Sequence, residues 1–396
     1  MFSVSHIFQF TASFFEVVSL NRVGGSTPFV TLDYGTFLGA QDGNLTSFLG
    51  IPFADSPVGD LRFRLPVPPP QLEGVQRAVS FGAACPQHAL SPLPGMNFTG
   101  KYTKVSEDCL AINIIRPSFK LVPGRNLPVL VYFHGGGFEI GDATETRMND
   151  IIDRSVHSGE PLMVVVPNYR LNGLGFLAGK EVKEAGVSNL GLQDQRFALQ
   201  WVQKYISSFG GDPDRVTISG VSAGAVSVAM HLVSLDGNPN GLFHSAFMLS
   251  GGPLRLPSVL DGQSEYDLIV SETNCSAERD TLSCLRRVPL DQIMAAINKT
   301  RDIFSYSSLN LAWQPRVDGD LLRREPYESL VQGLYAKVPS IAGTCDDEGT
   351  LFSLANLNIT TDEAFSEYIS SNYLKGTTSA EISDVLRAYP RDPTKG

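Results

Sequence analysis

The segment from Val216 to Ala225 places a serine where it could act as a nucleophile. It reads Val-Thr-Ile-Ser-Gly-Val-Ser-Ala-Gly-Ala: an apolar strand pattern, a Gly-x-Ser-x-Gly turn and the start of a helix pattern. A serine hydroxyl attacks a carbonyl effectively only when it is held clear of the backbone within reach of a base. Gly220 and Gly224 leave room for the tight turn that presents Ser222 at its apex. The pattern therefore favours a nucleophilic serine over an ordinary glycine-rich turn.

A second glycine-rich segment could supply the hydrogen bonds that such a reaction needs. The apolar run Leu127–Phe133 is followed by His134-Gly-Gly-Gly-Phe138. Successive glycines cost conformational entropy, so their use at the end of a strand requires a reason. Backbone N–H groups that approach a substrate oxygen closely are such a reason, and a flexible turn is the alternative. With the serine turn present, we predict that Gly136, Gly137 and Ala223 donate hydrogen bonds to an oxyanion.

The elements that would position these residues alternate between strand and helix. Short, fully apolar runs are typical of parallel strands that helices cover on both faces. The alternation predicts an α/β fold with a doubly wound, mostly parallel sheet, whose sites lie at the carboxyl ends of its strands. From Phe29 to Phe53, β-type runs with turn dipeptides between them predict an N-terminal antiparallel meander. The predicted strands are Leu127–Phe133, Leu162–Val166, Val216–Ile218, Ala246–Leu249 and Val338–Ala342, and the predicted helices are Leu192–Ser208 and Ala223–Val233.

Composition excludes several classes of protein. The 396 residues are 42% hydrophobic and only 18% charged, which excludes a disordered chain. The net charge of −10 argues against binding to nucleic acid or to an anionic membrane. No apolar run reaches the roughly 18 residues of a membrane helix. We predict a soluble protein with a leader or a disordered start over residues 1–28, a single α/β domain over 29–396, and no cofactor or metal; the sequence predicts no oligomeric state.

Cysteines and glycosylation sequons bear on the compartment of the protein. Four of the five cysteines form two pairs that are close in sequence, and the fifth, Cys345, is expected to be a buried, unpaired thiol. Pairable cysteines beside sequons favour a secreted protein over a cytosolic one with unused sequons. The other cysteines are Cys85, Cys109, Cys275 and Cys284, and the sequons begin at Asn44, Asn97, Asn274, Asn298 and Asn358.

Several segments resemble one family. Phe209–Gly224 is similar to the serine signature of the type-B carboxylesterase/lipase family, and Glu107-Asp-Cys-Leu110 is similar to its second signature. The resemblance continues in order along nearly the whole chain from about Thr31. It implies an α/β-hydrolase fold and the hydrolysis of hydrophobic carboxylic esters, small or lipid, through an acyl-enzyme on Ser222. Other matching segments are Gly50–Ala54, Asn168–Arg170 and Asn189–Gln195.

The resemblance also implies pairings. It implies a disulfide between Cys85 and Cys109, which would close a loop over the active site, and another between Cys275 and Cys284. It implies as well that Arg62 and Glu107 form a structural ion pair rather than a catalytic one.

The acid of the site follows the serine in this family. The run Val338–Ala342 leads into Gly343-Thr-Cys-Asp-Asp-Glu-Gly-Thr350, and the family's acid lies in a similar Asp-Glu-Gly-Thr segment. The resemblance therefore selects Glu348 rather than Asp346 or Asp347. A solvated acidic loop is the alternative interpretation.

Two departures from the family matter. Val221 stands where many relatives carry Glu before the serine. More importantly, the histidine should follow the acid, but all six histidines (6, 88, 134, 157, 231 and 244) precede Glu348. Of these, His134 belongs to the oxyanion segment, and His231 and His244 are expected to pack or cap.

The missing histidine suggests two explanations. We expect a carboxyl-truncated member of the family that by itself is a very poor esterase and leaves apolar surface exposed. The alternative is a non-catalytic binding or adhesion protein on the same fold, although such proteins typically lose the serine or the acid.

Overall fold

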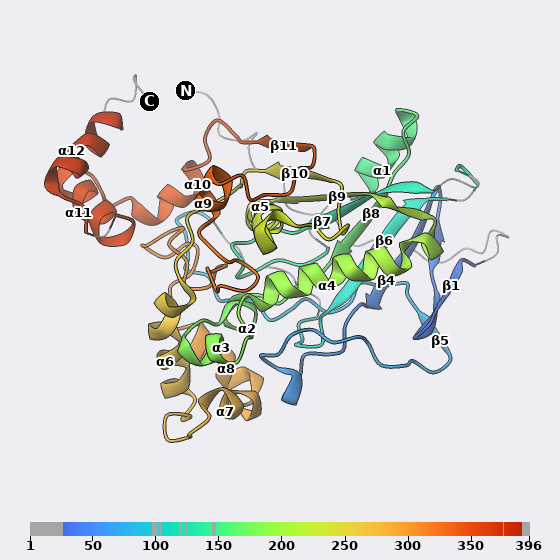
Figure 1. Cartoon of the computed structure of the whole chain (residues 1–396), viewed down its shortest axis with the longest axis horizontal. Helices are drawn as coiled ribbons and strands as arrows, with labels where there is room; N and C mark the ends of the chain where they lie inside the picture. The colour runs from blue at the N-terminus through green and yellow to red at the C-terminus, as the bar shows by residue number, and fades with distance from the viewer. Residues whose placement is uncertain are drawn as a thin grey trace.

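The computed structural model describes residues 27–96, 102, 104–118, 120–122, 126–144, 148–374 and 376–389 (Figure 1). Most of the predicted leader, residues 1–26, and the sequon at Asn97 lie outside these residues. The centre is an eight-stranded sheet in the order β11-β10-β9-β7-β8-β6-β4-β3. Its strands are β3 (Ala40–Asp42), β4 (Leu45–Pro52), β6 (Ala111–Pro117), β7 (Leu127–Phe133), β8 (Met163–Pro167), β9 (Gly211–Val221), β10 (Ser245–Leu249) and β11 (Ser340–Gly343).

The sheet is mixed, with its parallel part on one side. β11, β10, β9, β7 and β8 are parallel neighbours, whereas β6, β4 and β3 join antiparallel. This confirms the predicted mostly parallel sheet. The N-terminal region is antiparallel as expected, but its strands divide between two sheets. β1 (Phe29–Leu32) and β2 (Gly35–Leu38) form a hairpin that pairs with β5 (Val75–Arg77) in a separate three-stranded sheet.

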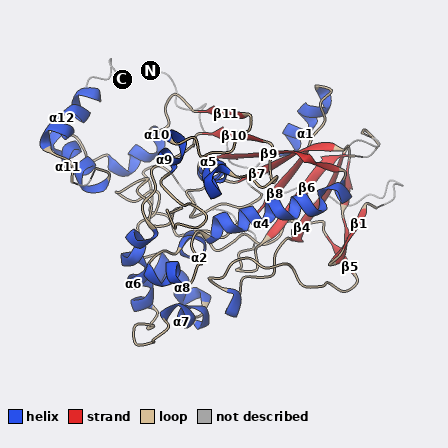
Figure 2. Ribbon diagram, viewed as in Figure 1, coloured by secondary structure: helices blue, strands red, loops and turns tan. Residues whose placement is uncertain are grey.

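Alternating side chains bury both faces of the central sheet. In β8, Met163 and Val165 join the larger core cluster, whereas Val164 and Val166 join a smaller one with Ile152 of the helix α1. Successive side chains of a strand point to opposite faces, so a strand covered on both sides must be apolar throughout. Figure 2 accordingly shows α1 on one side of the sheet and α4 on the other.

The helices connect and cover these strands. α5 has the bounds predicted for it, and α4 begins two residues before the predicted start. α11 and α12 lie away from the sheet (Figure 1). The helices are α1 (Met148–His157), α2 (Asn172–Phe176), α3 (Lys180–Glu184), α4 (Leu190–Tyr205), α5 (Ala223–Val233), α6 (Gln263–Glu272), α7 (Thr281–Arg287), α8 (Leu290–Ile297), α9 (Pro326–Val331), α10 (Thr350–Ser353), α11 (Asp362–Asn372) and α12 (Ser379–Ala388).

One strand forms where it was predicted but is not buried as predicted. The run Val338–Ala342 was expected to form a strand buried on both faces, but β11 is the edge strand and its residues are largely exposed. Ile341 keeps 65% of its surface accessible. A short apolar run indicates that a strand can be buried, but the neighbouring elements decide whether it is. An edge strand has a hydrogen-bonded partner on one side only.

Candidate active site

Ser222 lies at a sharp turn between strand and helix. β9 ends at Val221, α5 begins at Ala223, and Ser222 between them has φ +54° and ψ −123°. Such a positive φ is strained for a residue with a side chain, so the surrounding structure must hold it. Ser222 N donates to Leu249 O at 2.9 Å, and Ser222 O accepts from Val226 N at 2.9 Å. The end of β10 and the first turn of α5 thus fix the serine from two sides.

Two glycines make this turn possible. A Cβ on Gly220 would lie 2.4 Å from the carbonyl carbon of Gly224, and a Cβ on Gly224 would lie 2.0 Å from Phe133 O. Both distances are far below contact distance. The sequence-based reason for these glycines is therefore steric: the turn folds back against itself and against the end of β7.

The glycine-rich segment lies against the same turn. A Cβ on Gly135 would be 3.3 Å from Ser222 Cβ, so the two segments are in contact. Gly136 and Gly137 have φ of +103° and +64°, which glycine adopts without strain. The structure therefore brings the three predicted oxyanion donors, Gly136, Gly137 and Ala223, into adjoining segments beside the serine.

His134 belongs to the glycine-rich segment and stabilises it through contacts of its ring. Its ring stacks on that of Tyr169 with centroids 4.3 Å apart, and its Nδ1 donates to Gly135 O at 2.9 Å. Tyr169 OH donates to His134 O at 2.8 Å. Burial lowers the pKa of His134 to about 4, so the ring is neutral at pH 7. His134 therefore acts as a structural support of the glycine-rich segment to which it belongs.

The other described histidines also lie away from the serine hydroxyl. His231 Nε2 donates to Gln195 Oε1 at 3.0 Å, and burial lowers the pKa of His231 to about 3. His244 Nδ1 accepts from Val216 N at 3.4 Å, in the middle of β9. Among the residues that the structure describes, no histidine ring hydrogen-bonds to Ser222. The remaining two rings contact backbone carbonyls: His88 that of Ile297 and His157 that of Asp153.

Glu348 and Ser222 both follow the carboxyl ends of their strands, but the hydrogen bond of the Glu348 side chain is not to Ser222. Leu249 of β10 pairs with Val221 on one side and with Gly343 of β11 on the other. The ends of β9 and β11 are therefore level and two strand spacings, about 10 Å, apart. Glu348 follows in the exposed loop after β11, and its Oε1 accepts from Cys345 N at 2.7 Å. A further side chain is needed to connect this carboxylate with the serine.

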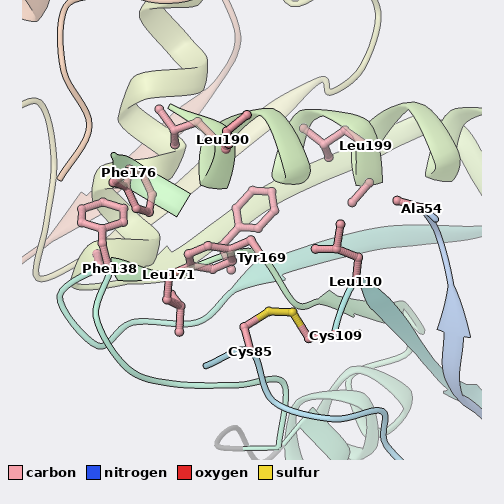
Figure 3. Packing of buried hydrophobic residues seen from close by; sticks show 14 of the residues in the cluster. Ala54, Cys85, Cys109, Leu110, Phe138, Tyr169, Leu171, Phe176, Leu190 and Leu199 are labelled. Atoms are coloured by element: carbon pink, nitrogen blue, oxygen red, sulfur yellow. A yellow bond between two sulfur atoms is a disulfide. The ribbon is translucent and has the colours of Figure 1, made fainter. Parts of the chain in front are cut away.

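The cysteines divide as the resemblance implies. Cys85 is bonded to Cys109, beside buried side chains close to the glycine-rich segment (Figure 3), and Cys275 to Cys284. Cys345 is free, but the expectation that it is buried is wrong, because its loop is exposed like the edge strand before it.

The structure also contains a buried ion pair that the sequence analysis did not identify. Arg170 and Asp194 form a buried bidentate ion pair with N–O distances of 2.8 and 2.6 Å. It fastens the segment after β8 to α4. Both residues belong to segments that matched the family, and that match is the signal that could have pointed to them. Arg62 and Glu107 form the ion pair that the resemblance implied, at 2.6 and 2.7 Å.

The described residues include no cluster of three or more His, Cys, Asp or Glu side chains suited to a metal ion. In the same part of the chain, no helix has the length and apolar character required to cross a bilayer.

Comparison with known proteins agrees with this architecture. The chain is 38% identical to Lipase 4 of Diutina rugosa over 96% of its own length and 72% of that protein's. It is 38% identical to Secreted triacylglycerol lipase LIP1 of Gibberella zeae, covering 93% of this chain and 65% of the relative. The crystal structure of Aspergillus niger EstA superposes with a TM-score of 0.80 at 34% identity, covering 92% of this chain and 68% of the other. The predicted α/β-hydrolase fold is confirmed. Because the Carboxylesterase family profile matches residues 26–390, the chain belongs to that family.

Proposed function

We propose that this protein is a serine carboxylic ester hydrolase that acts on hydrophobic esters through an acyl-enzyme on Ser222. The observation that carries the proposal is the contact between the strained serine turn and the glycine-rich segment. A nucleophile beside backbone N–H groups is the arrangement that acyl transfer requires. The lipases and esterases among the relatives support the same class of reaction.

The proposed reaction has two halves. Ser222 Oγ attacks the ester carbonyl, and the N–H groups of Gly136, Gly137 and Ala223 bind the negative oxygen that develops. The alcohol leaves with a proton, and water then releases the acid from the acyl-enzyme. Each half needs a base that takes a proton and returns it, with Glu348 as the carboxylate that orients this base.

The identity of that base is the open element of the site. Every histidine of the sequence precedes Glu348, and the five that are described are bound elsewhere. We therefore propose that the 396 residues alone turn over esters slowly. The same observation favours a second candidate function, a non-catalytic binding protein that retains the fold.

Chemical rescue distinguishes these two functions. The 396-residue chain is assayed on p-nitrophenyl butyrate with increasing imidazole, and the Ser222→Ala variant measures the background that imidazole itself produces. A hydrolase that lacks only its base should show imidazole-dependent turnover above that background, and a fluorophosphonate should label Ser222 when imidazole is present. If the two proteins respond identically and neither is labelled with imidazole present, the hydrolase function fails and the non-catalytic alternative is favoured.

We also propose that the protein is extracellular and glycosylated. Relatives carry the word secreted in their names, two disulfides are present, and four sequon asparagines are exposed. Expression through a eukaryotic secretory route, with peptide mapping before and after glycan removal by an amidase, should find glycans on some of them. The four are Asn44, Asn274, Asn298 and Asn358.

A further inference from the structure

A buried carboxylate follows directly after the glycine-rich segment. Glu139 is 0% exposed, and its Oε1 has no hydrogen-bond partner. It faces a second buried ionisable side chain, His88, with 3.6 Å between Glu139 Oε2 and His88 Nδ1. The reaction proposed above uses neither residue. An isolated charge at such a position is costly, so the pair requires an explanation.

The hydrogen bond of His88 defines which of its ring nitrogens carries a hydrogen. His88 Nε2 lies 3.1 Å from Ile297 O, and a carbonyl only accepts, so Nε2 carries a hydrogen. In a neutral ring, Nδ1 is then a bare lone pair that faces the carboxyl group. The 3.6 Å between Nδ1 and Glu139 Oε2 is beyond hydrogen-bond distance, and Nδ1 has no hydrogen-bond partner. Because two facing lone pairs in a buried site repel, a protonated Glu139 is the form that fits opposite Nδ1.

Burial also favours the neutral form of Glu139. It raises the pKa of Glu139, because desolvation disfavours the carboxylate. A protonated Glu139 leaves this buried site without net charge. The nearby Asp302 binds elsewhere, accepting from Ser91 N, Ser91 Oγ and Phe304 N.

Glu139 also connects three segments of chain. Its backbone N–H donates to Gly136 O at 3.0 Å, and its backbone O accepts from His88 N at 2.9 Å. Its side-chain Oε2 accepts from Ile303 N at 2.8 Å. Ile303 in turn packs against Gly137, where an added Cβ would lie 2.5 Å from Ile303 Cδ1. The position of both glycines therefore depends on what holds Glu139.

We propose that Glu139, in its neutral form opposite His88, is a positioning residue that holds Gly136 and Gly137 where their N–H groups meet the oxyanion. This inference rests on the proposed function. The Glu139 side chain does not hydrogen-bond to Ser222; it acts through the backbone of the glycine-rich segment.

Two substitutions at Glu139 separate this role from ordinary packing. Ile303 N and His88 Nδ1 both meet Glu139 at Oε2. Glu139→Gln keeps an oxygen there for Ile303 N and, like a protonated Glu139, carries no charge. Glu139→Leu removes the hydrogen bond with Ile303 N. Glu107→Gln is the matched control, because Glu107 is another buried carboxylate whose partner, Arg62, contacts α7 and the residue after it rather than the glycine-rich segment.

The first measurement is the rate constant for fluorophosphonate labelling of Ser222 with imidazole present, per folded molecule. Loss of one oxyanion donor costs roughly 100- to 1000-fold in turnover, so displacing the segment should slow labelling at least about tenfold in Glu139→Leu. Glu139→Gln and Glu107→Gln should stay within about threefold of the wild type. Equal rates for Glu139→Leu and wild type would overturn the positioning role. Equal damage from Gln and Leu would overturn the neutral form of Glu139 and its hydrogen bond with Ile303 N as what holds the segment.

The second measurement does not depend on reactivity. Hydrogen exchange at the amides of residues 135–141 should accelerate in Glu139→Leu and not in Glu107→Gln. If the wild type is never labelled even with imidazole present, the proposed function fails, while exchange still decides the positioning role: unchanged exchange overturns it. If Glu139→Leu does not fold, Glu139→Met, which also lacks an acceptor for Ile303 N, is measured in its place with the same expected outcomes.

Discussion

The two halves of the candidate site differ in how the fold holds them. Ser222 lies between a central strand and a buried helix, and contacts from β7, β10 and α5 force it into a strained conformation. Glu348 lies beyond an edge strand in an exposed loop, where its carboxylate bonds to the backbone of the same loop. Packing from several elements thus fixes the conformation of Ser222, whereas the position of the Glu348 carboxylate depends on a hydrogen bond within its own loop. Substitutions should be costly in the first region and mild in the second.

The largest difference should come from matched isoleucines on β9 and β11. Ile218 is fully buried and Ile341 is 65% exposed. Ile218→Ala should lower the free energy of unfolding by about 4 kcal/mol, because it removes buried methyl groups and leaves a cavity. Ile341→Ala should lower it by less than about 1 kcal/mol. Urea unfolding measures both, and equal losses would contradict the difference between centre and edge.

Matched glycines test the turns themselves. Gly224→Ala places a methyl group 2.0 Å from Phe133 O, whereas a Cβ on Gly349, beside Glu348, meets nothing within 4 Å. Gly224→Ala should cost roughly 3 kcal/mol of stability and abolish labelling of Ser222. Gly349→Ala should change stability by no more than about 0.5 kcal/mol. Thermal unfolding with fluorophosphonate labelling checks both; a stable, reactive Gly224→Ala would show that the turn has more room than we infer.

Acid should weaken the central region through His134. Its pKa falls from 6.5 to about 4 on folding, so the folded state binds the proton less well. The resulting stability is present above pH 6.5 and is lost as the pH falls toward 4. At pH 4.5 the loss from this residue is roughly 2 kcal/mol.

His134→Phe, which can still stack on Tyr169, provides the control. Its unfolding free energy should decline less steeply between pH 7 and 4.5 than that of the wild type, as measured by urea titration at each pH. Parallel declines would assign the pH dependence to other groups.

The smallest effect concerns a thiol and leaves stability unchanged. Cys345 is exposed near Glu348, whereas the other four cysteines are in disulfides. A maleimide should modify the native protein once, and Cys345→Ser should remove that modification. Peptide mapping that finds Cys345 protected would mean that the acid loop is covered in solution.

Local chemistry determined much of the architecture from the sequence alone. The strand Leu127–Phe133 and the helix Ala223–Val233 have the bounds that their apolar patterns predict. The turn at Ser222 was predictable too, because the small residues that it requires, Gly220 and Gly224, lie within two positions of the serine, although the Phe133 O that excludes a side chain at Gly224 belongs to β7. Such information is contained in neighbouring residues, so the sequence alone can reveal it.

Tertiary structure decided what depends on partners distant in sequence. It set β6 between β8 and β4, left β11 exposed at an edge, and kept Cys345 accessible. It also brought Glu139 to His88, 51 positions earlier in the sequence. Burial and pairing are properties of the neighbours that the chain assembles around a residue. Two similar runs are therefore buried at β9 and exposed at β11, and only the folded arrangement distinguishes them.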